Sequence, residues 1–200
     1  MTDALEERLV AEFANASAQA RYLFTCRFTK IMKLNLLLLK IFLGKRSEAG
    51  MFISVDRPHS YTYAALKKQG VPQHGIIYID IISKLTGIKS EESQVKFTAS
   101  GYAPRILSDY FSRAYIPEGA LRHFINLDEM NFIVIDNIGV MLQYTTMDKV
   151  KKFTGDLLEL LKKYASMRAV FIVDPQTAPE IHSHLKGFIE KEIPVMEEWL

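Results

Sequence analysis

The stretch MFISVDRPHSYTYAALKKQGVPQHGIIYIDII, residues 51–82, holds two apolar runs that flank a segment with helix boundaries. The runs MFISV (51–55) and GIIYIDII (75–82) are nearly continuous in apolar and β-branched side chains, which is typical of strands buried on both faces. Residues 59–70 follow a proline and end in a glycine, as helices commonly do. The stretch therefore predicts a strand, a crossover helix and a second, parallel strand.

The same alternation continues along the chain. NFIVID (131–136) and AVFIVD (169–174) predict two further buried strands, and RYLFT (21–25) and VKFTA (95–99) predict two weaker ones. Residues 147–165 place apolar side chains at three- and four-residue steps with charged residues opposite them, which predicts an amphipathic helix. Together these segments predict an α/β fold with a mostly parallel central sheet.

The length of 200 residues and the 48% apolar composition favour a single domain with a sizeable core. Residues 1–20 are expected to form an N-terminal helix packed on that domain. The polar stretch 83–94 is expected to be a surface loop. Prolines 104, 117 and 179 lie where helices are expected to begin.

Charge and cysteine content narrow the class of protein. The formal charge is +2, with 25 basic and 23 acidic residues, so binding of nucleic acid or membranes by the whole surface is not expected. The single cysteine, Cys26, cannot form an intrachain disulfide and is expected to be a buried small side chain. Lysines interrupt the apolar stretch 31–43, which is shorter than the roughly 20 residues that span a bilayer. With no secretory signal pattern, we expect a cytoplasmic protein.

Several catalytic motifs are missing from the sequence. Gly70 and Gly75 have the spacing of a phosphate-binding loop, but the chain continues as a strand instead of Lys-Ser or Lys-Thr. The segment GKRS (44–47) lacks the partner glycine five positions earlier. No two glycines are separated by one residue, so the dinucleotide-binding fingerprint is absent. His182 and His184 are two residues apart on a predicted helix and would point to different sides, so we expect no metal site there.

Five segments, taken in order, resemble the core of RecA/KaiC-like ATPases, and in particular the small archaeal KaiC-related proteins. The resemblance covers about residues 20–175 and implies a three-layer α/β/α fold of the P-loop NTPase type. The segments are YLFTCRFTKIMKLNLLLLKIFL (22–43), GMFISVDRPHSYTYAALKKQGV (50–71), GIIYIDIIS (75–83), NFIVIDN (131–137) and RAVFIVD (168–174).

The resemblance places the phosphate loop at about residues 26–33, where the chain reads CRFTKIMK and has no glycine. Phe28 and Ile31 are bulky where phosphate oxygens need bare backbone. The resemblance also implies that the strand ending in Asp136 corresponds to the strand that organises magnesium, and that Asp56 stands where the family often has water-activating acids. We expect no binding of ATP and magnesium in the usual pose and no catalytic residues.

The first functional hypothesis is therefore a non-catalytic RecA/KaiC-like domain that regulates or scaffolds through protein contacts. Its partner would be another protein or further copies of this chain. Trp199 and Leu200 could contribute a docking point, although packing back on the domain is the commoner outcome for large apolar side chains.

A second hypothesis retains nucleotide or small-anion binding in an altered form, as a switch or a weak ATPase. Open α/β sheets bind ligands at the carboxyl ends of their strands. The candidate contacts there could equally be turn formers, and they are Asp56, Arg57, Asp136, Asn137 and Asp174.

A third hypothesis uses the segment 27–46, which has six basic residues and no acidic one. Such a patch could contact nucleic acid or an anionic membrane surface. The alternative is a core helix whose lysines extend to solvent. The basic residues are Arg27, Lys30, Lys33, Lys40, Lys45 and Arg46.

Overall fold

The computed structural model describes residues 2–82, 95–97, 130–164 and 166–196. Within them, seven strands form one sheet in the order β4-β3-β2-β5-β6-β1-β7, and neighbouring strands are parallel throughout. The strands are β1 (Arg21–Thr25), β2 (Ala49–Ser54), β3 (Ile76–Asp80), β4 (Val95–Phe97), β5 (Met130–Ile135), β6 (Arg168–Val173) and β7 (Lys191–Pro194).

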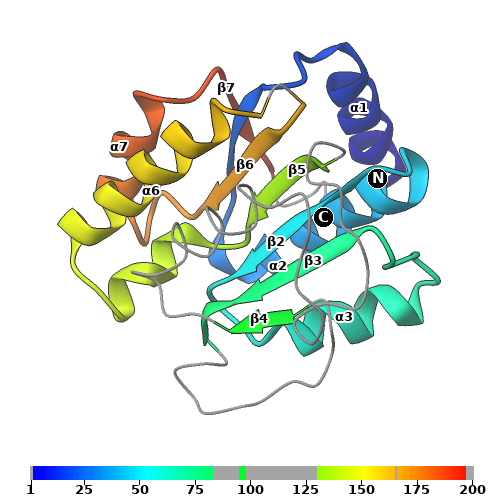
Figure 1. Cartoon of the computed structure of the whole chain (residues 1–200), viewed down its shortest axis with the longest axis horizontal. Helices are drawn as coiled ribbons and strands as arrows, with labels where there is room; N and C mark the ends of the chain where they lie inside the picture. Colours follow the sequence, from blue (N-terminus) through cyan, green and yellow to red (C-terminus); the bar gives the residue numbers. More distant parts are fainter. Residues whose placement is uncertain (1, 83–94, 98–129, 165, 197–200) are drawn as a thin grey trace.

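Helices cover both faces of this sheet (Figure 1). One face packs against α1 (Thr2–Asn15), α2 (Phe28–Leu39), the π-helix η1 (Lys40–Lys45) and α3 (His59–Lys68). The other face packs against the 3-10 helix η4 (Ile138–Gln143), α6 (Met147–Leu161) and α7 (Pro179–Lys186). The predicted three-layer α/β/α fold class is thereby confirmed.

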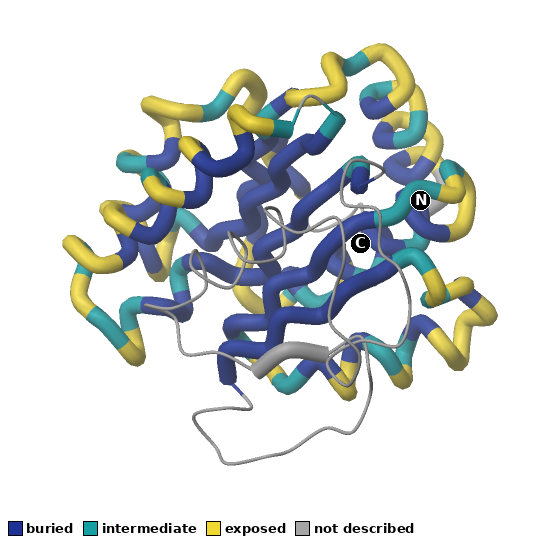
Figure 2. Tube along the Cα trace, in the orientation of Figure 1, coloured by how far each residue is buried: buried dark blue, intermediate teal, exposed yellow. Residues whose placement is uncertain are grey.

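The alternation of side chains along each strand divides the core into two clusters. Phe52 and Phe132 point to the α1–α2–α3 side, where Phe42 stacks on Phe132 with ring centroids 4.6 Å apart. Ile53 and Ile133, the neighbouring residues along the same strands, point to the α6–α7 side. Figure 2 shows the strands as the buried centre and exposed residues on the outer surfaces of the helices. Both faces are apolar, which explains the continuous apolar runs in the sequence.

Some element boundaries differ from the sequence predictions. Strand β3 ends at Asp80 rather than at residue 82, and residues 81–82 are already helical. Helix α6 ends at Leu161 rather than at residue 165. Strand β7 was not predicted, because its sequence KEIP has one buried side chain and so lacks an apolar pattern. Gly70 ends the α3 region with a φ of +70°, a conformation that suits glycine.

Several predicted features lie outside the described residues. They are the surface loop at 83–94, the helix starts at Pro104 and Pro117, and the docking residues Trp199 and Leu200.

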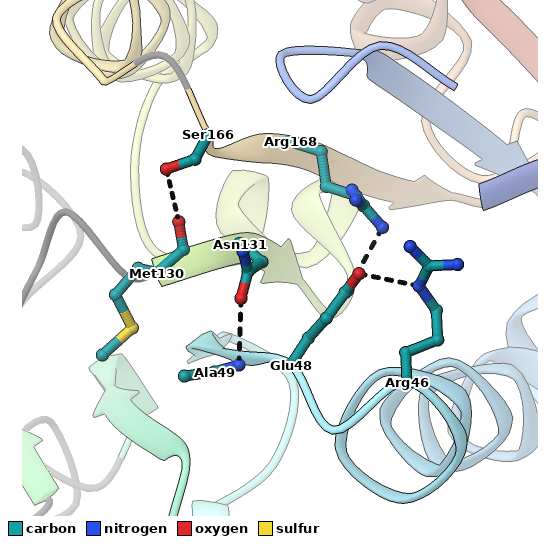
Figure 3. Close-up of polar contacts among 7 residues, drawn as sticks. All are labelled: Arg46, Glu48, Ala49, Met130, Asn131, Ser166 and Arg168. Carbon is teal, nitrogen blue, oxygen red and sulfur yellow. Dashed lines mark hydrogen bonds and ion pairs between the residues drawn. The ribbon is translucent and has the colours of Figure 1, made fainter. Parts of the chain in front are cut away.

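Polar contacts tie together the amino ends of the central strands (Figure 3). Glu48 accepts hydrogen bonds from Arg46 Nε at 2.7 Å and from Arg168 Nη1 at 3.2 Å. The side chain of Asn131 accepts one from the backbone N–H of Ala49. Arg168 is buried, so its guanidinium needs this carboxylate partner. These contacts join β2, β5 and β6 at the edge opposite the strands' carboxyl ends.

Candidate functional site

Three buried aspartates lie at the carboxyl ends of strands β3, β5 and β6. Asp80 is the last residue of β3, and Asp136 and Asp174 directly follow β5 and β6. Each side chain accepts a backbone N–H from the segment that follows an adjacent strand. Because buried carboxylates need hydrogen-bond donors, these contacts hold the loops at this edge in place.

Asp136 joins the end of β5 to the loop that follows β2. Its Oδ1 accepts from the N–H of Val55 at 2.9 Å and from that of Asn137 at 2.6 Å, and its Oδ2 accepts from the N–H of Asp56 at 3.3 Å. The aspartate that the family resemblance related to magnesium thus makes a structural contact to the protein's own backbone.

Burial raises the pKa of Asp136 from its usual 3.8 to about 7, although its backbone hydrogen bonds oppose this rise. The negative charge of Asp56 adds to it. Burial and the same two carboxylates also raise the pKa of Tyr144, which follows η4. At the carboxyl ends of β2 and β5, the ionised forms of Asp136 and Tyr144 are therefore disfavoured.

This raised pKa predicts how stability depends on pH. An aspartate that binds its proton more tightly in the folded state stabilises the fold at low pH, and this contribution is lost as pH rises through the folded pKa. We expect the free energy of unfolding to fall by roughly 2–3 kcal/mol from this group between about pH 5 and about pH 8. Urea denaturation at a series of pH values measures this slope.

The matched variant is Asp136→Asn, whose amide oxygen can keep the contacts to Val55 and Asn137. Since asparagine does not ionise, we expect this variant to have a flatter stability profile and to be at least as stable as the wild type at about pH 8. An unchanged slope in Asp136→Asn would show that other groups set the pH dependence.

The carboxylate of Asp174 lies at the N-terminus of α2. Only Cys26 and Arg27 separate β1 from this helix, and the Oδ2 of Asp174 accepts a hydrogen bond from the N–H of Phe28 at 2.8 Å. Its Oδ1 accepts from the N–H of Gln176 at 2.9 Å. Helix N-termini attract anions, and here a carboxylate of the protein is the anion.

Asp80 is a residue of this edge that sequence reasoning missed. Its Oδ2 lies 2.7 Å from both the backbone nitrogen and the Nδ1 of His59, the first residue of α3. Both side chains are buried. The sequence did contain a signal for this contact, since Asp80 stands inside the apolar run 75–82. A carboxyl group in a buried strand needs a polar partner, so an apolar run with an aspartate in it indicates such a contact.

The predicted contact residues at this edge fall into two places. Asp56 and Asn137 lie beside Asp136, between β2 and β5, and Arg57 Nε is 3.4 Å from the carboxylate of Asp56. Asp174 follows β6, the strand next to β5, and contacts the segment after β1. Asn137 is buried, and its Nδ2 has no hydrogen-bond acceptor among the described residues.

The six basic residues of the segment 27–46 lie in two places in the structure, three at the start of α2 and three in or just after η1. Lys40 and Lys45 form ion pairs with Glu6 of α1 at 2.9 and 2.6 Å, and Arg46 pairs with Glu48. Lys40 and Lys45 share the single carboxylate of Glu6, and Arg46 shares that of Glu48 with Arg168, so these contacts balance part of the positive charge of the segment. Arg27 precedes α2, and Lys30 and Lys33 lie in its first two turns.

Cys26 is buried, and His182 and His184, which are two residues apart on α7, each contact a side chain of the protein itself. Cys26 is buried as predicted, and burial followed by the charge of Asp174 raises the pKa of its thiol to about 12. His182 Nε2 lies 2.7 Å from Glu192, whereas His184 Nε2 lies 2.9 Å from Thr154 Oγ1. Across the described residues, no group of three His, Cys, Asp or Glu side chains could hold a metal ion.

No protein-family model matches the chain, and no curated protein sequence is significantly similar to it. An uncharacterized protein from Pyrococcus horikoshii, crystallised in complex with an unknown peptide, superposes with a TM-score of 0.68 and 13% identity. The match covers 95% of this chain and 82% of that one.

A KaiC-like protein from the same archaeon gives a TM-score of 0.49 and 11% identity, over 81% of this chain and 64% of that one. No helix in the described part of the chain is long and apolar enough to cross a membrane. At 13% identity, the likeness to the first of these structures concerns the α/β fold alone.

Proposed function

We propose that this protein is a non-catalytic domain of RecA/KaiC-like type that regulates or scaffolds through protein contacts. The observation that carries the proposal is the hydrogen bond from the N–H of Phe28 to the carboxylate of Asp174. This bond uses the helix terminus that holds phosphate in P-loop proteins.

A triphosphate does not fit the residues present. A phosphate at the start of α2 would face the negative charge of Asp174, and like charges at this distance repel strongly when they are shielded from water. Residues 26–33 offer no glycine for a backbone cradle. Asp136, the candidate partner of magnesium, already accepts three backbone hydrogen bonds.

Exposed apolar side chains at the same edge support the contact role. Phe28, Tyr144 and Met196 are 39%, 41% and 46% exposed, and they follow β1, η4 and β7. These three side chains offer apolar contact area to a partner, although Tyr61 and Phe188 are similarly exposed and single exposed apolar side chains are common on protein surfaces. The Pyrococcus horikoshii protein of similar fold was crystallised with a peptide, which is compatible with this role.

The proposal predicts that ATP, ADP and GTP, with or without magnesium, leave the Tm of the purified protein unchanged. A ligand at a hundred times its Kd would stabilise the folded state by about 2.7 kcal/mol, which thermal denaturation detects as a rise of several degrees. Calorimetric titration provides the second measurement. Binding that depends on magnesium and disappears in Asp136→Ala would contradict the proposal and indicate a nucleotide switch.

A further inference from the structure

The helices α2 and α3 contain no acidic residue. They lie beside each other on one face of the sheet, and the side chains of Lys33, Lys67 and Lys68 are exposed, with Lys30 half-exposed. Among the described residues, Lys30, Lys67 and Lys68 form no ion pair. The third α-helix of this layer, α1, is acidic, so the positive charge is confined to α2 and α3. Two adjacent helices whose charged side chains are all basic favour an anionic partner.

Apolar side chains accompany these cations on the outer surface. Tyr61 is 62% exposed, and Lys68 lies seven residues further on, so both occupy the same side of α3. On α2, the half-exposed Leu36 lies three residues after the exposed Lys33 and four residues after the half-exposed Met32, so Leu36 is a surface neighbour of both side chains. The surface thus combines positive charge with apolar groups that are accessible from solvent.

We propose that the outer surface of α2 and α3 binds anionic lipid membranes peripherally. This surface is defined by Lys30, Lys33, Lys67, Lys68, Tyr61, Met32 and Leu36. Basic side chains attract acidic headgroups, while aliphatic and tyrosine side chains enter the boundary between headgroups and acyl chains.

A membrane fits this surface better than a nucleic acid does. Single strands are bound by grooves with several aromatic rings for stacking, whereas the defined surface has one ring, that of Tyr61, beside the aliphatic side chains of Met32 and Leu36. Two neighbouring helices present a broad layer, which can meet a flat lipid surface along its length. The role goes beyond the proposed protein contacts, which concern the carboxyl edge of the sheet.

Co-sedimentation with vesicles tests the proposal on the full chain. We expect binding to phosphatidylcholine vesicles that contain about one third phosphatidylserine, no binding to pure phosphatidylcholine, and release as salt rises well above about 0.1 M. The double variant Lys30→Gln/Lys68→Gln should bind about 25-fold more weakly, because each cation near the surface contributes about fivefold. Tyr61→Ser should weaken binding further without changing the salt dependence.

The matched control is Lys149→Gln/Lys163→Gln, which removes the same charge at exposed positions in and just after α6, on the opposite face. This control should bind like the wild type. No binding to acidic vesicles at low salt would overturn the proposal, as would equal weakening in both double variants. Binding to single-stranded DNA or RNA without binding to vesicles would also overturn it and would identify the surface as a nucleic-acid site.

Discussion

Gly50→Ala is expected to lower the free energy of unfolding by more than about 3 kcal/mol. Gly50 lies in β2 opposite Phe132 of β5, next to an irregularity in the pairing of the two strands. A Cβ at this position would overlap the carbonyl oxygen of Phe132 and would lie 2.5 Å from the Cγ of its ring. The ring cannot move away, because it is fully buried and stacks on Phe42.

The overlap includes backbone atoms, so truncation of Phe132 should restore only part of the lost stability. The control is Gly155→Ala in α6, where an added Cβ meets no atom within 4 Å. That change should stabilise the protein by about 0.5–1 kcal/mol, since alanine is the better helix former. Urea denaturation followed by far-UV circular dichroism measures both variants, and a Gly50→Ala protein within about 1 kcal/mol of the wild type would refute the prediction.

Arg168→Ala is expected to cost about 3 kcal/mol or more. The guanidinium is buried between Glu48, whose Oε2 is 3.2 Å away, and the rings of Phe13 and Phe42, whose centroids are 5.9 and 5.7 Å away. Burial lowers the pKa of Arg168, while the carboxylate of Glu48 opposes this shift. Removal of the arginine leaves one oxygen of a nearly buried carboxylate without its donor and opens a space beside two rings.

Two variants separate the ion pair from general packing at this position. Arg46→Ala removes the other, more exposed partner of Glu48 and should cost less than about 1 kcal/mol. Replacement of both buried partners, Arg168→Met with Glu48→Met, should recover at least half of the loss, because it removes the unpaired charge. Arg168→Met alone keeps most of the bulk but leaves Glu48 without its buried partner, so equal losses in this single variant and in the double variant would show that packing, and not charge, dominates.

Much of the fold could be predicted from local sequence. The strands at 21–25, 131–136 and 169–174 were found within one residue of their observed bounds, because strands buried on both faces need continuous apolar runs. The end of the α3 region was signalled by Gly70, which adopts a positive φ. Strand β7 was missed because edge strands are short and polar, and pairing with β1 is what defines it.

The candidate site could be predicted only in part. Asp136 and Asp174 were identified as residues at strand ends, since parallel strands bring their carboxyl ends to one edge. Their partners could not be identified, because Asp174 contacts Phe28 from 146 residues away and Asp136 contacts Val55 from 81 residues away. The ion pairs of Lys40 and Lys45 with Glu6 could not be predicted either, because Glu6 lies in α1, more than 30 residues earlier in the chain.

Local sequence was sufficient for the α/β class and for the finding that the Gly-x-x-x-x-Gly-Lys-Ser/Thr motif does not occur in the chain, because both depend on residue types at short spacing. The tertiary structure alone revealed that the carboxylate of Asp174 lies at the start of α2, that His59 pairs with Asp80, and that α2 and α3, two helices without acidic residues, lie side by side. Such features depend on which segments become neighbours after folding, and packing of the two apolar faces of the sheet sets those neighbours.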